Sequence, residues 1–284
     1  MTALTGRPLP SPYADEVGAA AYAVSRDGWS PYAAAYDLDG GREPSRTYLI
    51  ATTQRSGSHL LAHAMAWAGA AVPLEYANPF LAEIELMRRG RAITAEARRA
   101  LLEEIRLGRT TSDGLFGLKA HWHHWEAVLS DGEARTLLEP QAVIHVQRRD
   151  LLSQAVSLVF SRRTGSWISF DGSRAADPGP YDADAVGAAL GLIVDEQRAW
   201  EAWFDSAGIA PLRLCFDHIV AEPQHMGLAA ASFVDERRGV IPAQGMPVAL
   251  PQPQDDAIKR EWLVRARAEF GLPRNPSPKA DCCG

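Results

Sequence analysis

The chain has 284 residues, of which 46% are hydrophobic and 23% charged, and its formal net charge is −6. This length and apolar content are enough to bury a substantial core, in one large α/β domain or two small ones. The acidic balance argues against non-specific nucleic-acid binding, because surfaces that neutralise phosphates need a basic face.

The first 45 residues are expected to form an extension with little core of its own. They carry several prolines and the Gly40-Gly41 pair, with one short helix expected at residues 14–25. No basic stretch followed by an apolar run occurs near the start, so no secretory signal is expected. The longest mostly apolar stretch, residues 60–74, is too short to span a bilayer, and no membrane partner is expected.

The three cysteines predict neither a metal site nor a disulfide framework. Cys215 is far along the chain from the adjacent Cys282 and Cys283, and no spacing typical of metal ligands occurs. A reducing cytoplasm is therefore the expected compartment.

Strands and helices are expected to alternate from residue 46 onward, which predicts an α/β fold with a central parallel sheet and helices on both faces. Strands are expected at residues 47–52, 114–120, 142–147 and 211–216. Helices are expected at residues 60–67, 79–89, 94–107, 122–129, 151–163, 183–207 and 256–270. The domain is predicted to cover residues 46–274, with loops over the active face at 164–180 and 240–253 and a disordered tail at 275–284.

The segment after the first strand has the pattern of an anion-binding turn. It runs from Ile50 through Thr53 and Gln54 to Ser58 and leads into an apolar helical run. Backbone N–H groups and the positive end of the helix then point at one spot, as for a phosphate or sulfate. The small residues of the turn let an anion approach, and its arginine adds a planar cation. These residues are Arg55, Ser56, Gly57 and Ser58. The Walker lysine pattern is absent, which weighs against an ATPase or GTPase.

A second basic turn follows the third strand. Arg148 and Arg149 come directly after it, and the next helix presents Ser153 and Ser157. An arginine at a strand end with serines one or two turns later is able to hold a second phosphate. The alternative is an exposed basic turn with an ordinary capping Asp150. Two anion sites on one sheet edge would suit a nucleotide that carries phosphate at both ends.

Several further motifs follow in a fixed order along the chain. They are Pro73-x-Glu75-Tyr76, Gly117-Leu118-Lys119, Val146-x-Arg148-x-Asp150 with Ser153-Gln154-Ala155-Val156-Ser157, and Trp200-Glu201-Ala202-Trp203-Phe204. Together with the first turn, this set resembles in order and spacing the bacterial sulfotransferase family typified by trehalose 2-sulfotransferase. The resemblance covers roughly residues 46–270.

The resemblance implies a P-loop-like fold and the donor 3′-phosphoadenosine 5′-phosphosulfate, with no metal. By position, the loop from Gln54 to Ser58 would hold the 5′-phosphosulfate. Arg148 with Ser157 would hold the 3′-phosphate, and Arg149 is the neighbouring candidate. Arg55 would stabilise charge growing on the leaving phosphate oxygen.

Two residues compete for the role of general base. Glu75 stands where the resemblance places the family's catalytic carboxylate, and its apolar neighbours suggest a raised pKa; otherwise it is a surface acid in a loop. His121, with Lys119 before it, resembles the Lys-x-His element of the cytosolic aryl and steroid sulfotransferases, in which the histidine is the base. Lys119 is also the only lysine before the last thirty residues. Glu75 is favoured because the whole-chain resemblance is to the family that uses the carboxylate.

The other candidates have simpler interpretations. His121, His123 and His124 do not share one helical face, so a zinc site is not expected. Trp200 and Trp203 are expected in the core. Trp167 lies in a loop, where it either stacks on an acceptor or has no role in binding.

The leading functional hypothesis is a sulfotransferase that moves a sulfuryl group to a hydroxyl of a carbohydrate or other small metabolite. The alternatives are a nucleotide-dependent kinase, disfavoured by the missing Walker lysine, and a non-catalytic nucleotide-binding protein. The expected partner is a small hydroxylated molecule, and a homodimer is left open.

Overall fold

The structure is a computed structural model that describes residues 30–38, 41–168, 177–236, 250–251 and 257–271. The helix expected at residues 14–25 and the tail expected at 275–284 lie outside these ranges, as does most of the loop expected at 240–253.

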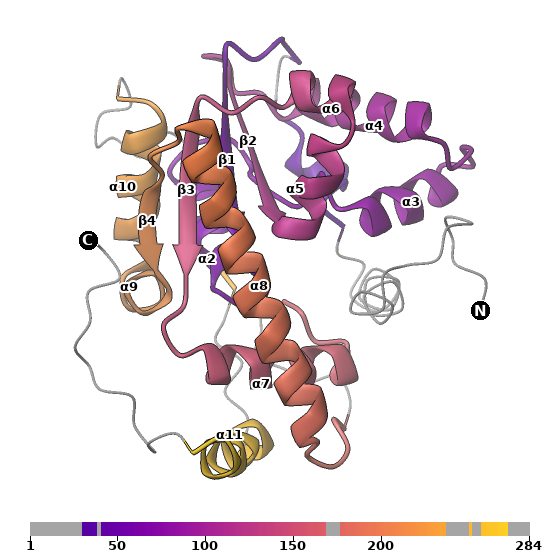
Figure 1. The fold of residues 1–284 in the computed structure, drawn as a ribbon. Coiled ribbons are helices and arrows are strands. Elements are labelled where there is room, and N and C mark those ends of the chain that lie inside the picture. Colours follow the sequence, from indigo (N-terminus) through magenta and orange to yellow (C-terminus); the bar gives the residue numbers. More distant parts are fainter. Residues whose placement is uncertain (1–29, 39–40, 169–176, 237–249, 252–256, 272–284) are drawn as a thin grey trace.

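The described residues form a four-stranded parallel sheet with the order β2-β1-β3-β4 (Figure 1). The strands are β1 (Arg46–Thr52), β2 (Leu115–His121), β3 (Ala142–Gln147) and β4 (Leu212–Cys215). Every residue of β2 and all but the first of β1 are buried, as expected for strands covered on both faces. The predicted α/β fold with a central parallel sheet is confirmed.

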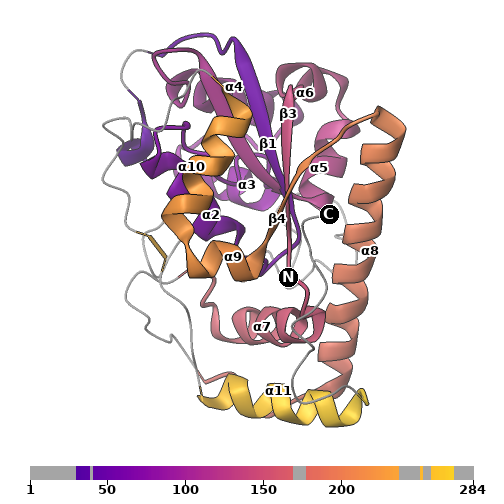
Figure 2. The ribbon, with the colours of Figure 1, turned by 90° about the vertical axis from the view of Figure 1, so that its left-hand side faces the viewer.

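Helices cover both faces of this sheet (Figure 2). On one side lie α2 (Ser58–Trp67) and α10 (Pro223–Val234), and on the other α5 (Trp122–Leu129) and α8 (Ala183–Ala207). The helices α2 and α10 approach closely, because a Cβ atom on Gly227 would lie 2.7 Å from the backbone of Ala64. On the opposite side, Trp200 of α8 is fully buried, which confirms its expected place in the core.

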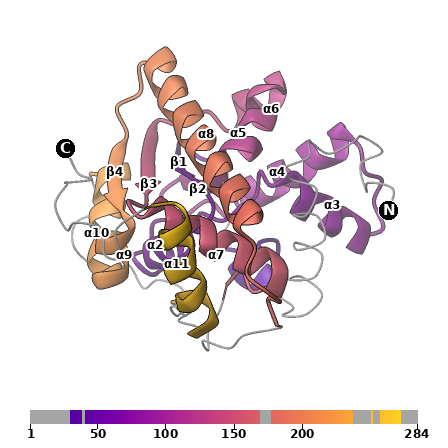
Figure 3. The same cartoon turned by 60° about the horizontal axis from the view of Figure 1, so that its bottom comes forward.

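Two helices lie beyond the carboxyl ends of the strands (Figure 3). They are α7 (Leu151–Thr164) and α11 (Ala257–Glu269), which share a small apolar cluster with α8. The register pairs Thr52 of β1 with both His121 of β2 and Val146 of β3, so these strands end at one edge. That edge is where ligands bind in open α/β sheets.

The remaining helices flank this arrangement. They are α3 (Pro79–Arg88), α4 (Ala95–Gly108), α6 (Gly132–Leu137), α9 (Phe216–Ala221) and a short 3-10 helix, η2 (Ala34–Tyr36). Of these, α6 and α9, together with α10, were not predicted from the sequence. Within the described part of the chain, no helix is both long and apolar enough to cross a membrane.

Residues 30–38 of the expected extension pack against the rest of the domain. Tyr32 is 3% exposed, belongs to the main core cluster, and donates its hydroxyl to the carbonyl of Tyr76 over 2.9 Å. The fully buried Arg109 donates to Asp37 over 2.8 Å and to the carbonyl of Ala33 over 2.8 Å. This part of the extension therefore supports the segment that carries Glu75.

Candidate active site

The turn between β1 and α2 has the backbone of an anion-binding loop. Arg55 (φ 61°) and Gly57 (φ 85°) both lie in the left-handed region, and Gly57 is the N-cap of α2. A side chain at Gly57 would also collide with Phe216, since its Cβ would lie 2.8 Å from the ring. Glycine is therefore required here on two counts. The N-terminus of α2 lies at this turn, where its positive end favours an anion.

A side chain of helix α7 holds this loop in place by hydrogen bonds. Gln154, fully buried, donates from Nε2 to Thr53 Oγ1 over 2.7 Å and to the carbonyl of Gln54 over 2.5 Å. Ser56 and Ser58 are also buried. The predicted loop residues thus occupy one ordered turn at the carboxyl edge of the sheet.

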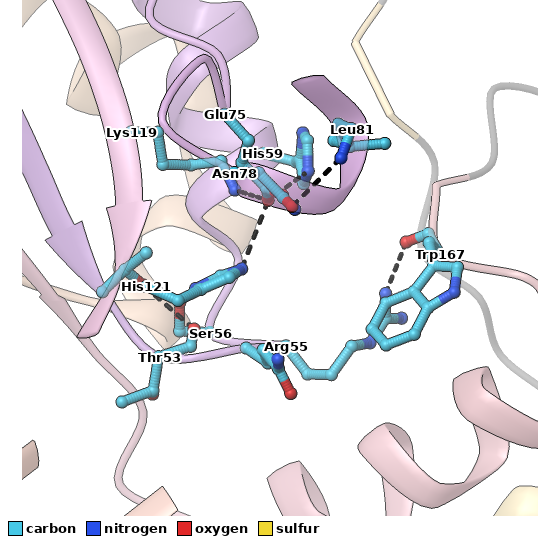
Figure 4. A network of polar contacts seen from close by, with 12 residues as sticks. Thr53, Arg55, Ser56, His59, Glu75, Asn78, Leu81, Lys119, His121 and Trp167 are labelled. Carbon is cyan, nitrogen blue, oxygen red and sulfur yellow. Dashed lines mark hydrogen bonds and ion pairs between the residues drawn. The ribbon is translucent and has the colours of Figure 1, made fainter. Parts of the chain in front are cut away.

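Arg55 links the loop to α7 and to the segment after it. Its Nε donates to Ser157 Oγ over 3.1 Å and its Nη1 to the carbonyl of Trp167, and Figure 4 shows the side chain extended toward that residue. Burial, followed by the charge of Arg148, lowers the pKa of Arg55 to about 10. The two positively charged guanidinium groups repel each other, so an anion beside them is favoured.

Arg148 lies against the same loop. Its Nη1 donates to the carbonyl of Arg55 over 3.2 Å, and its Nη2 donates to Ser153 Oγ over 2.6 Å. The guanidinium lies over the ring of Phe216, 4.1 Å from its centroid, and burial lowers its pKa to about 10. The structure thus brings Arg148, Arg55 and Ser157 together, with Ser157 bonded to Arg55, whereas Arg149 is exposed.

The second group of predicted residues surrounds the carboxylate of Glu75, which is 8% exposed (Figure 4). Its Oε1 accepts from Lys119 Nζ and lies 3.2 Å from His121 Nε2 and 3.1 Å from His59 Nε2. Its Oε2 accepts from Asn78 Nδ2 over 3.2 Å. Lys119 and His121 are two residues apart on β2, so their side chains leave the same face of the sheet.

The backbone fixes Glu75 to the sheet as well. It lies in the irregular segment between α2 and α3, and the N–H of Lys119 donates to the carbonyl of Leu74 over 2.9 Å. Asn78 accepts from the N–H groups of Phe80 and Leu81 and so caps α3. Each neighbour of the carboxylate therefore belongs to a regular element or its cap.

The expectation of a raised pKa for Glu75 is wrong. Burial by itself raises this pKa, but the charges of Lys119 and His121 and the hydrogen bonds from His121 and His59 hold it well below its usual range. Glu75 is therefore ionised at neutral pH. Burial and then the charge of Lys119 lower the pKa of His59 to about 3, so His59 is neutral.

The carboxylate of Glu75 lies at the same edge of the sheet as the β1–α2 loop, which contains Arg55 and is contacted by Arg148. Comparison with known proteins identifies the family to which the chain belongs. The family model described as Stf0 sulphotransferase matches residues 47–269. The chain belongs to this sulfotransferase family. The trehalose 2-sulfotransferase of Mycobacterium tuberculosis (strain ATCC 35801 / TMC 107 / Erdman) is 26% identical over 268 residues, covering 80% of this chain and 98% of that protein. Its counterpart in Mycolicibacterium smegmatis is 22% identical, covering 80% and 97%. The family predicted from the motifs is confirmed, and the protein is a sulfotransferase enzyme.

Three residues of this candidate site were not identified by the sequence motifs. His59 follows the loop motif directly and contacts Glu75, Asn78 holds the other oxygen of Glu75, and Phe216 supports Arg148. The Asn78-Pro79 pair is a helix-start signal, so Asn78 was detectable as a cap. No local pattern predicts the other two contacts.

The remaining histidines of this region have structural contacts. His123 Nδ1 lies 2.7 Å from Glu196 Oε1, and the fully buried His124 stacks edge-on against the ring of His123. Among the residues that the structure describes, no three His, Cys, Asp or Glu side chains are grouped so as to hold a metal ion.

Cys215 corrects another expectation from the sequence. The structure gives Cys215, the last residue of β4, as disulfide-bonded, whereas no disulfide was expected. The other two cysteines, Cys282 and Cys283, lie outside the described residues. The cysteine pattern therefore no longer supports a reducing compartment.

Three histidines with lowered pKa values make the stability of this sulfotransferase depend on pH. Burial lowers the pKa of His59 to about 3 and of His145 to about 4, and holds that of His124 well below its usual range. In the unfolded chain each takes up a proton near pH 6.5, whereas in the folded chain it stays neutral. The unfolded state then binds more protons, so lowering the pH destabilises the fold by about 1.4 kcal/mol per pH unit for each histidine.

We expect the free energy of unfolding, measured in denaturant at pH 7.5, 6.5 and 5.5, to fall below pH 6.5. His124→Phe should reduce the change of this free energy with pH by the contribution of one histidine. His225→Gln, at an exposed position, should leave the pH dependence unchanged. A free energy that stays constant over this range would contradict the conclusion that these three histidines are neutral in the folded chain.

Proposed function

We propose that this sulfotransferase transfers a sulfuryl group from 3′-phosphoadenosine 5′-phosphosulfate to a hydroxyl of a carbohydrate. The observation that carries the proposal is the arrangement of two arginines and one ionised carboxylate around the β1–α2 loop. Arg55 and Arg148 offer cations for an anionic donor, and Glu75 offers a base. No metal is required for this chemistry.

In the proposed donor site, each of the two arginines binds one anionic group of the donor. The turn from Gln54 to Ser58 would bind the 5′-phosphosulfate through backbone N–H groups, with Arg55 on the bridging oxygen. Arg148, with Ser157 nearby, would bind the 3′-phosphate. In support, the charge of Arg148 lowers the pKa of Arg55, so an anion between them would relieve their repulsion.

The proposed reaction is an in-line transfer with Glu75 as base. The acceptor hydroxyl loses its proton to Glu75 as its oxygen bonds to sulfur, and the bond from sulfur to the donor phosphate breaks with its electron pair on that phosphate. Glu75 is preferred over His121 because Nε2 of His121 already contacts Glu75 and its Nδ1 is buried without a hydrogen-bond partner among the described residues. Lys119 holds Glu75 ionised.

The acceptor class rests on the relatives, whose names specify trehalose. We extend this to a carbohydrate acceptor for the present chain, with the ring of Trp167 as a stacking surface for the sugar. A small hydroxylated partner and a cytoplasmic location stay predictions, and the homodimer stays open.

Two measurements test the proposal. Calorimetry should show tighter binding of 3′-phosphoadenosine 5′-phosphate than of ATP, and labelled donor should pass its sulfuryl group to members of a panel of sugars and hydroxylated metabolites. Preference for ATP would favour the kinase alternative. Donor binding with no transfer to any acceptor would favour a non-catalytic nucleotide-binding protein.

Replacing Arg148 should weaken donor binding. We expect Arg148→Ala to lower the affinity for 3′-phosphoadenosine 5′-phosphate by about 2 kcal/mol, or about 30-fold, the scale of a lost hydrogen bond to a charged group. The neighbouring exposed Arg149→Ala is the matched control and should bind almost normally. Normal binding by Arg148→Ala would refute its assignment to the 3′-phosphate and make Arg149 the next candidate.

A further inference from the structure

The two oxygens of the Glu75 carboxylate have unequal surroundings. Three nitrogen atoms surround Oε1, from Lys119, His121 and His59, whereas one, from Asn78, contacts Oε2. A carboxylate offers about four hydrogen-bonding sites in all, two on each oxygen. The capacity of Oε1 is therefore used, and Oε2 keeps room for one further donor.

His59 differs from the other two partners of Oε1 in position and charge. Its side chain is 23% exposed, compared with 0% for Lys119 and 9% for His121, so it approaches the carboxylate from the more open side. It is the second residue of α2, directly after Ser58 of the donor loop. Because His59 is neutral, the hydrogen bond that it donates orients the Glu75 carboxylate without adding a positive charge beside it.

We propose that Oε2 of Glu75 is the atom that accepts the acceptor's proton, and that His59 is a positioning residue that holds Oε1 and so aims Oε2. This inference rests on the proposed function and assigns its base to one atom. The proton moves from the acceptor hydroxyl to Oε2 while the acceptor oxygen bonds to sulfur. The donor's bridging oxygen keeps the electron pair of the broken S–O bond.

The placement of His59 also couples the base to the donor loop. Its backbone follows the loop within α2, and its ring touches the carboxylate, so the distance between bound donor and base is set through a short rigid connection. Such a connection holds reacting groups in attack geometry, and small displacements of it are costly to the rate. Figure 4 shows His59 beside Glu75, whereas the side chain of Arg55 in the loop extends away from them toward Trp167.

Asn78 is the second positioning group in this arrangement. It donates to Oε2 and caps α3 with its other atom, Oδ1. Asn78→Asp preserves the cap, because aspartate is as good a cap as asparagine, but it replaces the N–H donor with a second carboxylate. The substitution therefore removes the hydrogen bond to Oε2 of Glu75 and has little effect on the stability of α3.

The test compares two replacements of His59 with a matched histidine one turn further along α2. We expect His59→Phe to lower kcat about 10- to 100-fold, the range for one lost hydrogen bond to a charged group, with affinity for 3′-phosphoadenosine 5′-phosphate within about twofold of wild type. His59→Gln keeps an N–H donor and should recover most of the loss. His63→Gln, on the same helix, should leave kcat near the wild-type value.

A second measurement does not depend on turnover. Carbon-13 NMR of the Glu75 carboxyl, assigned by its loss in Glu75→Gln, should show a higher pKa in His59→Phe and in Asn78→Asp, and the acid limb of kcat should move to higher pH with it. An unchanged Glu75 titration and kcat in His59→Phe would overturn the proposal, as would a loss of donor affinity equal to the loss of kcat. If wild-type enzyme transfers no sulfuryl group, the proposed function fails, whereas the NMR result still reports on the His59 contact.

Discussion

Replacing Glu75 with glutamine is expected to lower kcat by roughly 10²–10⁴ while leaving the affinity for 3′-phosphoadenosine 5′-phosphate nearly intact. Glutamine keeps the shape of the side chain but has no basic oxygen. The proposed donor site consists of Arg55 and Arg148 on other elements, so donor binding should survive the change. Steady-state kinetics with saturating donor, together with calorimetry on the same preparation, measure the two effects separately.

The comparison with His121 decides which residue is the base. His121→Ala removes one of three nitrogen contacts to Oε1 of Glu75, and the carboxylate keeps Lys119 and His59. We therefore expect a smaller loss than in Glu75→Gln. Near-normal turnover by Glu75→Gln, with collapse in His121→Ala, would overturn the carboxylate assignment and favour the histidine mechanism of the cytosolic sulfotransferases.

The strands and the loop between β1 and α2 could be predicted because their signals are local. Continuous apolar runs such as residues 47–52 identify strands buried on both faces, and the small residues after Thr52 identify a turn. The helices α9 and α10 give weaker signals. Cys215 leads from β4 directly into α9 without a side-chain cap, and α10 is rich in alanine with a small polar face. Their position is set by packing, as at Gly227 against Ala64.

The electrostatics of the site could not be predicted, because they depend on contacts between distant residues. Glu75 has apolar sequence neighbours, which suggest a raised pKa, yet Lys119 lies 44 residues further along the chain and lowers it. The sequence identified both residues as candidates but not their ion pair. Likewise, Ser157 was expected to act with Arg148, and the structure bonds it to Arg55. Motifs identify chemical groups, whereas their pairing depends on the fold.

The Glu75–Lys119 pair should also be important for stability. Lys119 is fully buried and is paired with a carboxylate that is itself almost completely buried. Removing one partner of a buried pair leaves a charge without compensation, which typically costs about 3–5 kcal/mol. Lys119→Met, which keeps most of the apolar volume, should therefore lower the free energy of unfolding by about 3 kcal/mol or more. Arg135→Met, at an exposed position of α6, is the control and should change it by less than about 0.5 kcal/mol.

The pH dependence of this loss identifies its cause. Without Lys119, burial raises the pKa of Glu75 with less opposition, so the folded state binds a proton more readily than wild type does. A group whose folded pKa is raised contributes stability at low pH and loses it as the pH rises. The difference in unfolding free energy between Lys119→Met and wild type should thus be larger at pH 8 than at pH 5. Adding Glu75→Gln removes the uncompensated carboxylate, so the double variant should be more stable than Lys119→Met alone at pH 8. A double variant that loses the sum of the two single effects would show that the pair contributes no coupling, and the low pKa of Glu75 would then require another source.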